Sequence, residues 1–175
     1  MTFAGIVLAG GAATRLGGVD KPSLEVGGRT LIEIATAALD SASHVSIVGR
    51  EVAGGPVAAI AAALREIGAR TVVVLAADLP FVTAAAIDDL ISARGDARAA
   101  IAVDAGGRDQ PLLGCYDAHA LRAALPSDAD GASMRTVTAM LDAAGEVRRV
   151  DLGGDPPVCA DCDTPLDLVR ARELV

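Results

Sequence analysis

The chain has 175 residues, a formal net charge of −8, a hydrophobic content of 52% and an aromatic content of 2%. This length predicts a single domain over 1–175, with a core built from Ala, Val, Leu and Ile. The acidic balance and the absence of a basic stretch argue against nucleic acid and membranes as partners. An uneven number of cysteines and an N-terminus unlike a signal peptide predict a cytoplasmic protein.

Short β-branched runs alternate with Ala- and Leu-rich stretches along the chain. In chain order we expect a strand over 5–9, a helix over 30–42, a strand over 45–48, a helix over 57–67, a strand over 71–76, a helix over 83–93, strands over 99–103 and 112–116, helices over 118–124 and 133–143, a strand over 147–150 and a last helix from Thr164. The unbroken apolar run from Val72 to Leu75 is typical of a parallel strand buried on both faces. The alternation therefore predicts a doubly wound α/β fold, a Rossmann-like three-layer sandwich with a mostly parallel sheet.

A glycine-rich loop follows the first predicted strand and ends at Lys21, the only lysine among 15 basic residues. From Leu8 to Lys21 the loop reads LAGGAATRLGGVDK. Glycines let backbone N–H groups wrap an anion, and Arg15 and Lys21 add positive charge suited to a polyphosphate. The loop lacks both G-x-G-x-x-G and the P-loop spacing, and a plain strand-to-helix connector is the alternative.

A carboxylate, Asp78, follows the buried strand 71–76 directly. In this position it can hold Mg²⁺ against a phosphate, because hard oxygen donors suit that ion. The alternative is a helix cap, although Thr83 is the better-placed cap residue. Ligands of such sheets bind beyond the carboxyl ends of the strands, so we expect Asp78 and the glycine-rich loop at one edge.

These motifs, with others downstream, resemble the MobA-like nucleotidyltransferase family, the molybdenum cofactor guanylyltransferases and their relatives. The matching blocks occur in order over nearly the whole chain. They are Leu-Ala-Gly-Gly at 8–11 with Arg15 and Asp20-Lys21, Gly55-Pro56-Val57-Ala58-Ala59, Asp78-Leu79-Pro80, Gly107-Arg108-Asp109-Gln110-Pro111-Leu112, and Asp163-Thr164-Pro165-Leu166-Asp167-Leu168.

The resemblance implies one nucleotidyltransferase domain that uses Mg²⁺ as cofactor. It would transfer GMP from GTP to the terminal phosphate of molybdopterin, or of another phosphorylated small molecule, with release of pyrophosphate. Such a reaction depends on positioning and charge neutralisation more than on a nucleophilic side chain. Transient contact with proteins that insert or receive the cofactor is a further implication.

The resemblance also assigns roles to individual residues. The catalytic set is Arg15, Lys21 and Asp78. The nucleotide-binding set is Leu8, Ala9, Gly10, Gly11, Lys21, Glu51, Gly55, Pro56 and Asp78. The acceptor-binding set is Asp109, Gln110, Asp161 and Asp163, and the metal ligands are Asp78 and Asp163.

Two features depart from the family pattern. Asp161 and Asp163 stand at positions that are usually Asn in the guanylyltransferases, and the segment before Gly55 is shorter than usual, so Glu51 stands in for its acidic residue. Gly10 resembles the GTP-using members, since the cytidylyl-transferring relatives usually have Ala there. The alternatives are a related transferase that uses CTP or another phosphorylated acceptor, and a non-catalytic nucleotide-binding module.

Overall fold

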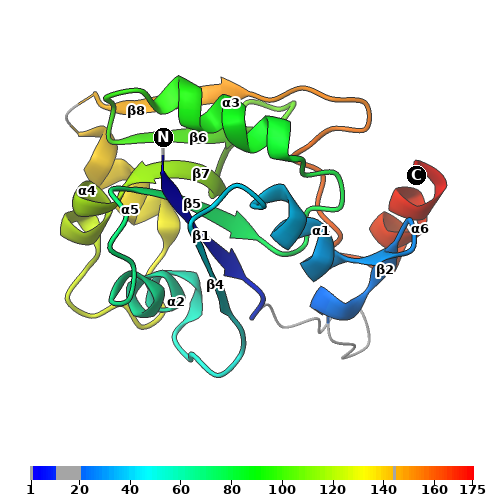
Figure 1. Ribbon diagram of the computed structural model, residues 1–175, viewed down its shortest axis with the longest axis horizontal. Coiled ribbons are helices and arrows are strands. Elements are labelled where there is room, and N and C mark those ends of the chain that lie inside the picture. The colour runs from blue at the N-terminus through cyan, green and yellow to red at the C-terminus, as the bar shows by residue number, and fades with distance from the viewer. Residues whose placement is uncertain (1, 11–20, 144) are drawn as a thin grey trace.

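A computed structural model describes residues 2–10, 21–143 and 145–175 of the protein (Figure 1). Its six-stranded sheet has the order β4-β1-β5-β7-β6-β8. The strands are β1 (Phe3–Leu8), β4 (His44–Val48), β5 (Thr71–Ala76), β6 (Ala99–Val103), β7 (Asp109–Asp117) and β8 (Val147–Asp151). Neighbouring strands are parallel except for β7, which is antiparallel to both β5 and β6. The predicted mostly parallel sheet is confirmed.

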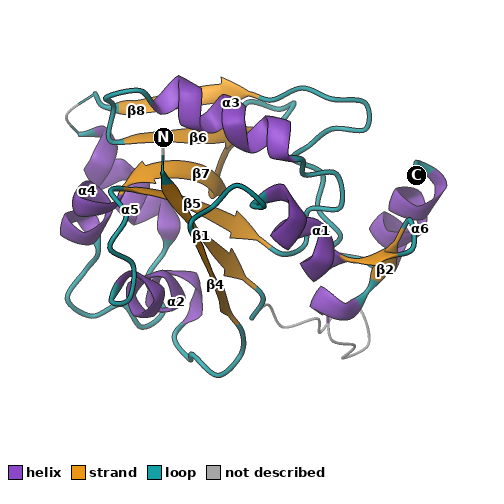
Figure 2. Ribbon diagram, viewed as in Figure 1, coloured by secondary structure: helices purple, strands orange, loops and turns teal. Residues whose placement is uncertain are grey.

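Helices cover both faces of this sheet and form the outer layers (Figure 2). They are α1 (Leu31–Ala38), α2 (Gly55–Leu64), α3 (Ala84–Arg94), α4 (Ala118–Ala124) and α5 (Met134–Asp142). A further helix, α6 (Pro165–Glu173), lies at one end of the molecule, away from the sheet. None of the helices in the described ranges is long and apolar enough to span a bilayer.

Alternate residues of the central strand feed two separate apolar cores. Val73 and Leu75 of β5 pack with α1 and α3 on one face, whereas Val72 and Val74 pack with α2, α4 and α5 on the other. Because successive side chains of a strand point to opposite faces, an unbroken apolar run is what a strand between two helical layers requires. The three-layer sandwich predicted from the run 72–75 is therefore confirmed.

Several boundaries differ from the sequence-based expectations. α1 begins at Leu31 with Thr30 as its cap, but it ends at Ala38, four residues before the expected end at 42. Two elements were not expected: a 3₁₀ turn, η2 (Lys21–Ser23), and a small hairpin of β2 (Glu25–Val26) and β3 (Arg29–Thr30). Strands of two residues are too short to show an alternating pattern. The hairpin packs beside α6 at one end of the molecule (Figure 1).

The direction of β7 decides which segment reaches the functional edge of the sheet. The carboxyl ends of β1, β4 and β5 lie at one edge, and β7 runs the opposite way, so its first residues arrive at that same edge. The strand begins at Asp109, three residues before the expected start at 112. The predicted acceptor residues Asp109 and Gln110 therefore lie on β7 itself.

A register shift in β7 shapes this edge further. Ile101 of β6 pairs with Gly114 whereas Ala102 pairs with Gln110, so the intervening residues of β7 bulge out of the β6 ladder. The hydroxyl of the buried Tyr116 donates to the Pro111 carbonyl across the bulge at 2.5 Å. A Cβ on Gly114 would come within 2.9 Å of the Tyr116 ring, so only glycine leaves room for this ring. Leu112, at the centre of the bulge, is thereby held at the edge of the sheet.

Candidate functional site

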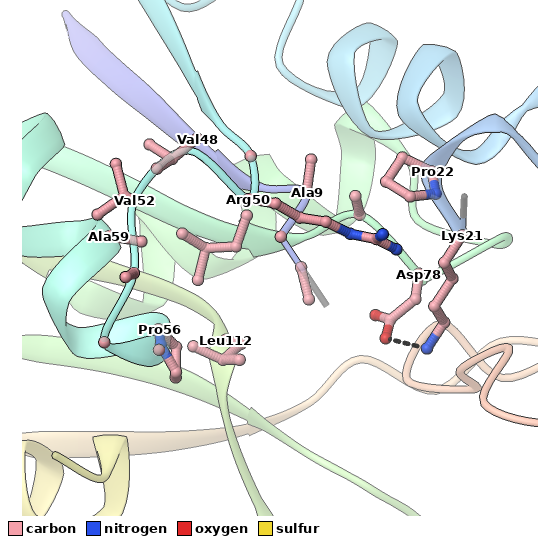
Figure 3. A pocket seen from close by; sticks show the side chains of 18 residues that line it. Ala9, Lys21, Pro22, Val48, Arg50, Val52, Pro56, Ala59, Asp78 and Leu112 are labelled. Carbon is pink, nitrogen blue, oxygen red and sulfur yellow. Dashed lines mark hydrogen bonds and ion pairs between the residues drawn. The ribbon is translucent and has the colours of Figure 1, made fainter. Parts of the chain in front are cut away.

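A cavity of about 490 Å³ opens at the carboxyl ends of β1, β4 and β5 (Figure 3). The start of α2 forms its opposite wall. Seven of the predicted nucleotide-site residues line it: Leu8, Ala9, Gly10, Lys21, Gly55, Pro56 and Asp78. The cavity thus brings together the end of the first strand, the Gly55-Pro56 turn and the carboxylate after β5, as the expected sheet edge requires.

Backbone contacts fix the shape of this cavity. The N–H of Ala9 donates to the Val48 carbonyl at 2.8 Å, and the N–H of Ala77 donates to the Leu8 carbonyl at 3.0 Å, so the strand pairing continues past the strand ends. A Cβ at Gly10 would lie 2.9 Å from the carbonyl oxygen of Gly49. The backbone of Gly10 therefore approaches the end of β4 too closely for any side chain there.

Lys21 lies at the edge of this cavity between two carboxylates from distant parts of the chain. Its Nζ is 2.7 Å from Asp78 Oδ2 and 2.5 Å from Asp163 Oδ1. Figure 3 shows the ion pair with Asp78. The N–H of Cys162 donates to the Asp78 carbonyl at 3.0 Å, which ties the segment containing Asp163 to the end of β5. Three residues that the sequence nominated separately thus form one ionic cluster.

The electrostatics of the cluster keep the lysine charged. Burial of Lys21 by itself lowers the pKa of the ammonium, but hydrogen bonds to Asp163 and Asp78, together with the charges of these carboxylates, raise this pKa above its ordinary value. The pKa of Asp161 is also raised, which for a carboxyl favours the neutral form. Its burial raises the pKa of the carboxyl, and the nearby charges of Asp163 and Asp78 raise it further.

A second cavity, of about 300 Å³, adjoins the first. The two share the residues Ala76, Asp78 and Leu112 as a common wall. Three of the predicted acceptor residues line the second cavity: Asp109, Gln110 and Asp161. Asp78 therefore contacts both cavities.

The second cavity also contains residues that the sequence did not nominate. Ser133 and Arg135, at the start of α5, line it together with Cys159. Arg135 is the cationic side chain among the described residues of this lining. No motif signalled it, because an arginine in the first turn of an amphipathic helix is ordinary surface composition.

The side chains of two predicted acceptor residues already have partners within the protein. Asp109 accepts two hydrogen bonds from Arg149, at 2.9 and 3.0 Å, and Arg149 also donates to Asp142 at 2.9 Å. The amide of Gln110 donates to Asp104 at 3.2 Å. These contacts stabilise the start of β7, which forms part of the cavity wall.

Glu51, the predicted substitute for the family's acidic residue, points elsewhere. Its exposed carboxylate accepts the N–H of Gly49 at 2.7 Å, and Glu51 is not among the described residues that line the first cavity. Hydrogen bonds from the backbone of Glu51 itself and of Gly49 lower the pKa of this carboxyl. The neighbouring Arg50, which the sequence did not nominate, lines the cavity, and its side chain extends across the cavity toward Pro22 and Lys21 (Figure 3).

Two nominated residues, Gly11 and Arg15, lie outside the described part of the chain. Within the described ranges, no group of three or more His, Cys, Asp or Glu side chains is arranged to hold a metal ion. Asp78 and Asp163 nevertheless each direct one oxygen at a single cation, the ammonium of Lys21. Mg²⁺ is commonly bound by one or two carboxylates with substrate phosphates and water, so this pair of hard donors fits it.

Comparisons with known proteins agree with this architecture. Residues 5–149 match the family described as the MobA-like NTP transferase domain. The molybdenum cofactor guanylyltransferase of Serratia proteamaculans (strain 568) is 28% identical, over 97% of this chain and 93% of its own length.

Two solved structures share the fold. The molybdopterin-guanine dinucleotide biosynthesis protein A of Archaeoglobus fulgidus has a TM-score of 0.71 at 22% identity, covering 99% of this chain and 97% of its own. The 2-C-methyl-D-erythritol 4-phosphate cytidylyltransferase of Thermus thermophilus also has a TM-score of 0.71, at 23% identity, and covers 99% of this chain and 98% of its own.

The three-layer fold is that of the α/β nucleotidyltransferases. Within that class, the chain belongs to the MobA-like NTP transferase domain family, whose match covers most of its length. The prediction of a nucleotidyltransferase of this family is confirmed.

Proposed function

We propose that the protein transfers GMP from GTP to the terminal phosphate of molybdopterin in a Mg²⁺-dependent reaction that releases pyrophosphate. The observation that carries the proposal is the junction of the two cavities at Asp78. One cavity adjoins the glycine-rich strand end and the other lies on the acceptor segment, so two substrates could meet at their common wall. The relative from Serratia proteamaculans, which matches over nearly its full length, bears the name of this activity.

The phosphates of the nucleotide would bind along the strand ends between Lys21 and Arg50. Both side chains line the first cavity, and a compact ammonium on a flexible stem can follow charge as it shifts toward the departing pyrophosphate. Mg²⁺, held by Asp78 and Asp163, would neutralise phosphate charge when bound. The task of the protein's own residues is to align the reacting groups and to exclude water.

The base would occupy the apolar part of the first cavity. Val52, Pro56 and Leu112 line this part. Among the described residues that line the first cavity, Asp78 alone carries a carboxylate. We therefore propose that the base is recognised through backbone groups near Gly54 and the end of β4. Because Glu51 already accepts the Gly49 N–H, its role would be to shape this backbone rather than to contact the base.

The acceptor would enter the second cavity. Arg135, exposed at the start of α5, would bind its phosphate, and the positive end of the α5 dipole favours the same anion. The wall formed by Pro111 and Leu112 would then set the distance between this phosphate and the nucleotide.

The direct test is pyrophosphate release from the purified protein with Mg²⁺, molybdopterin and each of the four NTPs in turn. We expect release with GTP only when molybdopterin is present, and loss of release in Asp78→Asn. Release with CTP instead of GTP would assign the protein to the cytidylyl-transferring alternative. Tight GTP binding without turnover, with any acceptor, would contradict the enzyme proposal and support a binding module.

A further inference from the structure

We propose that Lys21 is a placeholder cation: in the nucleotide-free protein its ammonium occupies the position of the metal between Asp78 and Asp163, and it leaves only when a triphosphate arrives. This inference rests on the proposed function, because it concerns the metal and the triphosphate of that reaction. It assigns Lys21 a positioning role that precedes catalysis.

The geometry makes the ammonium and a metal mutually exclusive. Nζ of Lys21 lies 2.7 Å from Asp78 Oδ2 and 2.5 Å from Asp163 Oδ1. A magnesium ion bound to these two oxygens would lie about 2.1 Å from each, in the space that the ammonium fills. The two cations would overlap, and their like charges would repel each other at this distance.

The placeholder is held firmly in the nucleotide-free state. The Lys21 side chain is only 11% exposed, although the side chains of Asp78 and Asp163 are more open, at 26% and 49%. Carboxylates that retain access to solvent can accept a metal from the cavity side once the ammonium has moved. Asp161 is a third carboxyl close enough to interact with Asp163, Asp78 and Lys21.

A triphosphate in the first cavity supplies the alternative partner for the ammonium. Lys21 lines that cavity, and its flexible four-carbon stem allows Nζ to turn from the carboxylates toward the phosphates. A metal that arrives bound to the triphosphate can then take the two carboxylates. Every charge remains paired during this exchange, whereas a metal arriving alone would displace the ammonium without giving it a new partner.

The exchange explains why this position is a lysine in a chain that otherwise uses arginine for its cations. A guanidinium would bind the carboxylates through a rigid fork and would release them less readily. The consequence is reciprocal coupling: the triphosphate raises the affinity for the metal, and the metal raises the affinity for the triphosphate by the same factor.

Lys21 can be observed directly, because it is the only lysine in the sequence. Labelling with side-chain ¹⁵N-lysine gives the full-length protein a single ammonium resonance. We expect Mg²⁺ alone to leave this resonance unchanged, and Mg²⁺ with inorganic tripolyphosphate, or with a GTP analogue that cannot be cleaved between the α and β phosphates, to shift it. A shift with Mg²⁺ alone, or no shift with either phosphate compound, would overturn the proposal.

Metal binding in the absence of nucleotide is a second test of whether the Lys21 ammonium excludes a metal ion. We expect Lys21→Met to bind Mn²⁺ at least tenfold more tightly than the wild type, as measured by electron paramagnetic resonance of free Mn²⁺. Arg149→Met is the matched control, because it also removes one cation shared by two aspartates. An unchanged affinity in Lys21→Met, or an equal gain in Arg149→Met, would contradict the proposal.

The outcomes separate this inference from the proposed function. Neither experiment requires turnover, so a protein that transfers no nucleotide can still show the exchange, and an active enzyme can fail to show it. Circular dichroism checks that Lys21→Met is folded. If it is not, the resonance of the wild-type lysine decides the question by itself.

Discussion

The protein contains two clusters in which one cation is shared by two aspartates, and they serve different purposes. Lys21 contacts Asp78 and Asp163, whereas Arg149 contacts Asp109 and Asp142. Both clusters join segments that are distant in the sequence. The Lys21 side chain is 11% exposed and lies at the edge of the first cavity, beside the wall that the cavities share; the Arg149 side chain is 44% exposed and lies outside their linings.

The two clusters have the same composition, one cation and two aspartates, but they differ in the exposure of the cation and in whether that cation lines a cavity. These surroundings determine the role of each cluster. Arg149 holds the start of β7 and the end of α5 to β8 through several hydrogen bonds, which suits a planar fork in a structural brace. Water screens this cluster, so its charges contribute little free energy. At Lys21 the ammonium is shielded from water and faces a cavity, although its two carboxylates remain partly exposed. Its ion pairs are therefore stronger than those of Arg149, and we propose that a ligand can take the place of the carboxylates as its partner.

The largest effect is expected from replacing Lys21, the cation of the cluster at the first cavity. Lys21→Arg should lower kcat/KM for pyrophosphate release by about 10²–10³-fold, the usual cost of losing one stabilising donor at a reacting group. The rigid guanidinium would keep both carboxylates occupied. Arg98→Lys is the control, since Arg98 pairs with Glu146 at the amino end of β6. Unchanged kinetics in Lys21→Arg would remove Lys21 from the reaction.

Removal of the same cation should also lower stability. Lys21→Met leaves two carboxylates facing each other beside Asp161, and we expect the free energy of unfolding to fall by about 1–3 kcal/mol, below the full cost of breaking a buried pair because both carboxylates are partly exposed. Urea unfolding at neutral pH measures the loss. Addition of Mn²⁺ should restore part of it. A variant as stable as the wild type would show that the cluster contributes no net stability.

The pH dependence of stability should distinguish the two clusters. The ion pairs raise the pKa of Lys21 in the folded state, so they stabilise the protein below the pKa of the unfolded lysine, and this contribution is lost as the pH rises through the folded pKa. The difference in unfolding free energy between wild type and Lys21→Met should thus be constant from neutral pH to about 10 and shrink above it. For Arg149→Met the difference should not shrink, because a guanidinium stays charged there.

The smallest effect is expected from replacing Arg149, the cation of the cluster outside the cavities. Arg149→Met should lower the free energy of unfolding by about 0.5 kcal/mol, within the usual range for solvent-exposed ion pairs. The loss should diminish in high salt, which screens exposed charges most. A loss as large as that of Lys21→Met, insensitive to salt, would mean that exposure does not account for the contrast between the clusters.

Much of the fold could be predicted from local patterns. The unbroken apolar run of β5 indicated a strand between two layers, and the alternation of strands with helices indicated a doubly wound sheet. The antiparallel direction of β7 could not be predicted, because an apolar strand has the same pattern in either direction. The hairpin of β2 and β3 was missed because its strands are too short to alternate.

The candidate site divides in a similar way. Gly10, Lys21 and Asp78 stand next to strand ends, where local sequence and the general rule for α/β sheets bring them to one edge. Arg50 and Arg135 carried no signal, since neither belongs to a motif. Glu51 was nominated as the substitute for the family's acidic residue, but its carboxylate accepts the N–H of Gly49.

The sequence by itself determined the layers of this protein, the strand ends that carry its glycines and Asp78, and the family to which it belongs, because hydrophobic periodicity and short motifs are local properties. Only the tertiary structure decided that Lys21 shares its ammonium with Asp163, 142 residues away, and that an antiparallel strand brings Asp109 to the same edge. Contacts between distant segments depend on chain direction and packing, which no local pattern records.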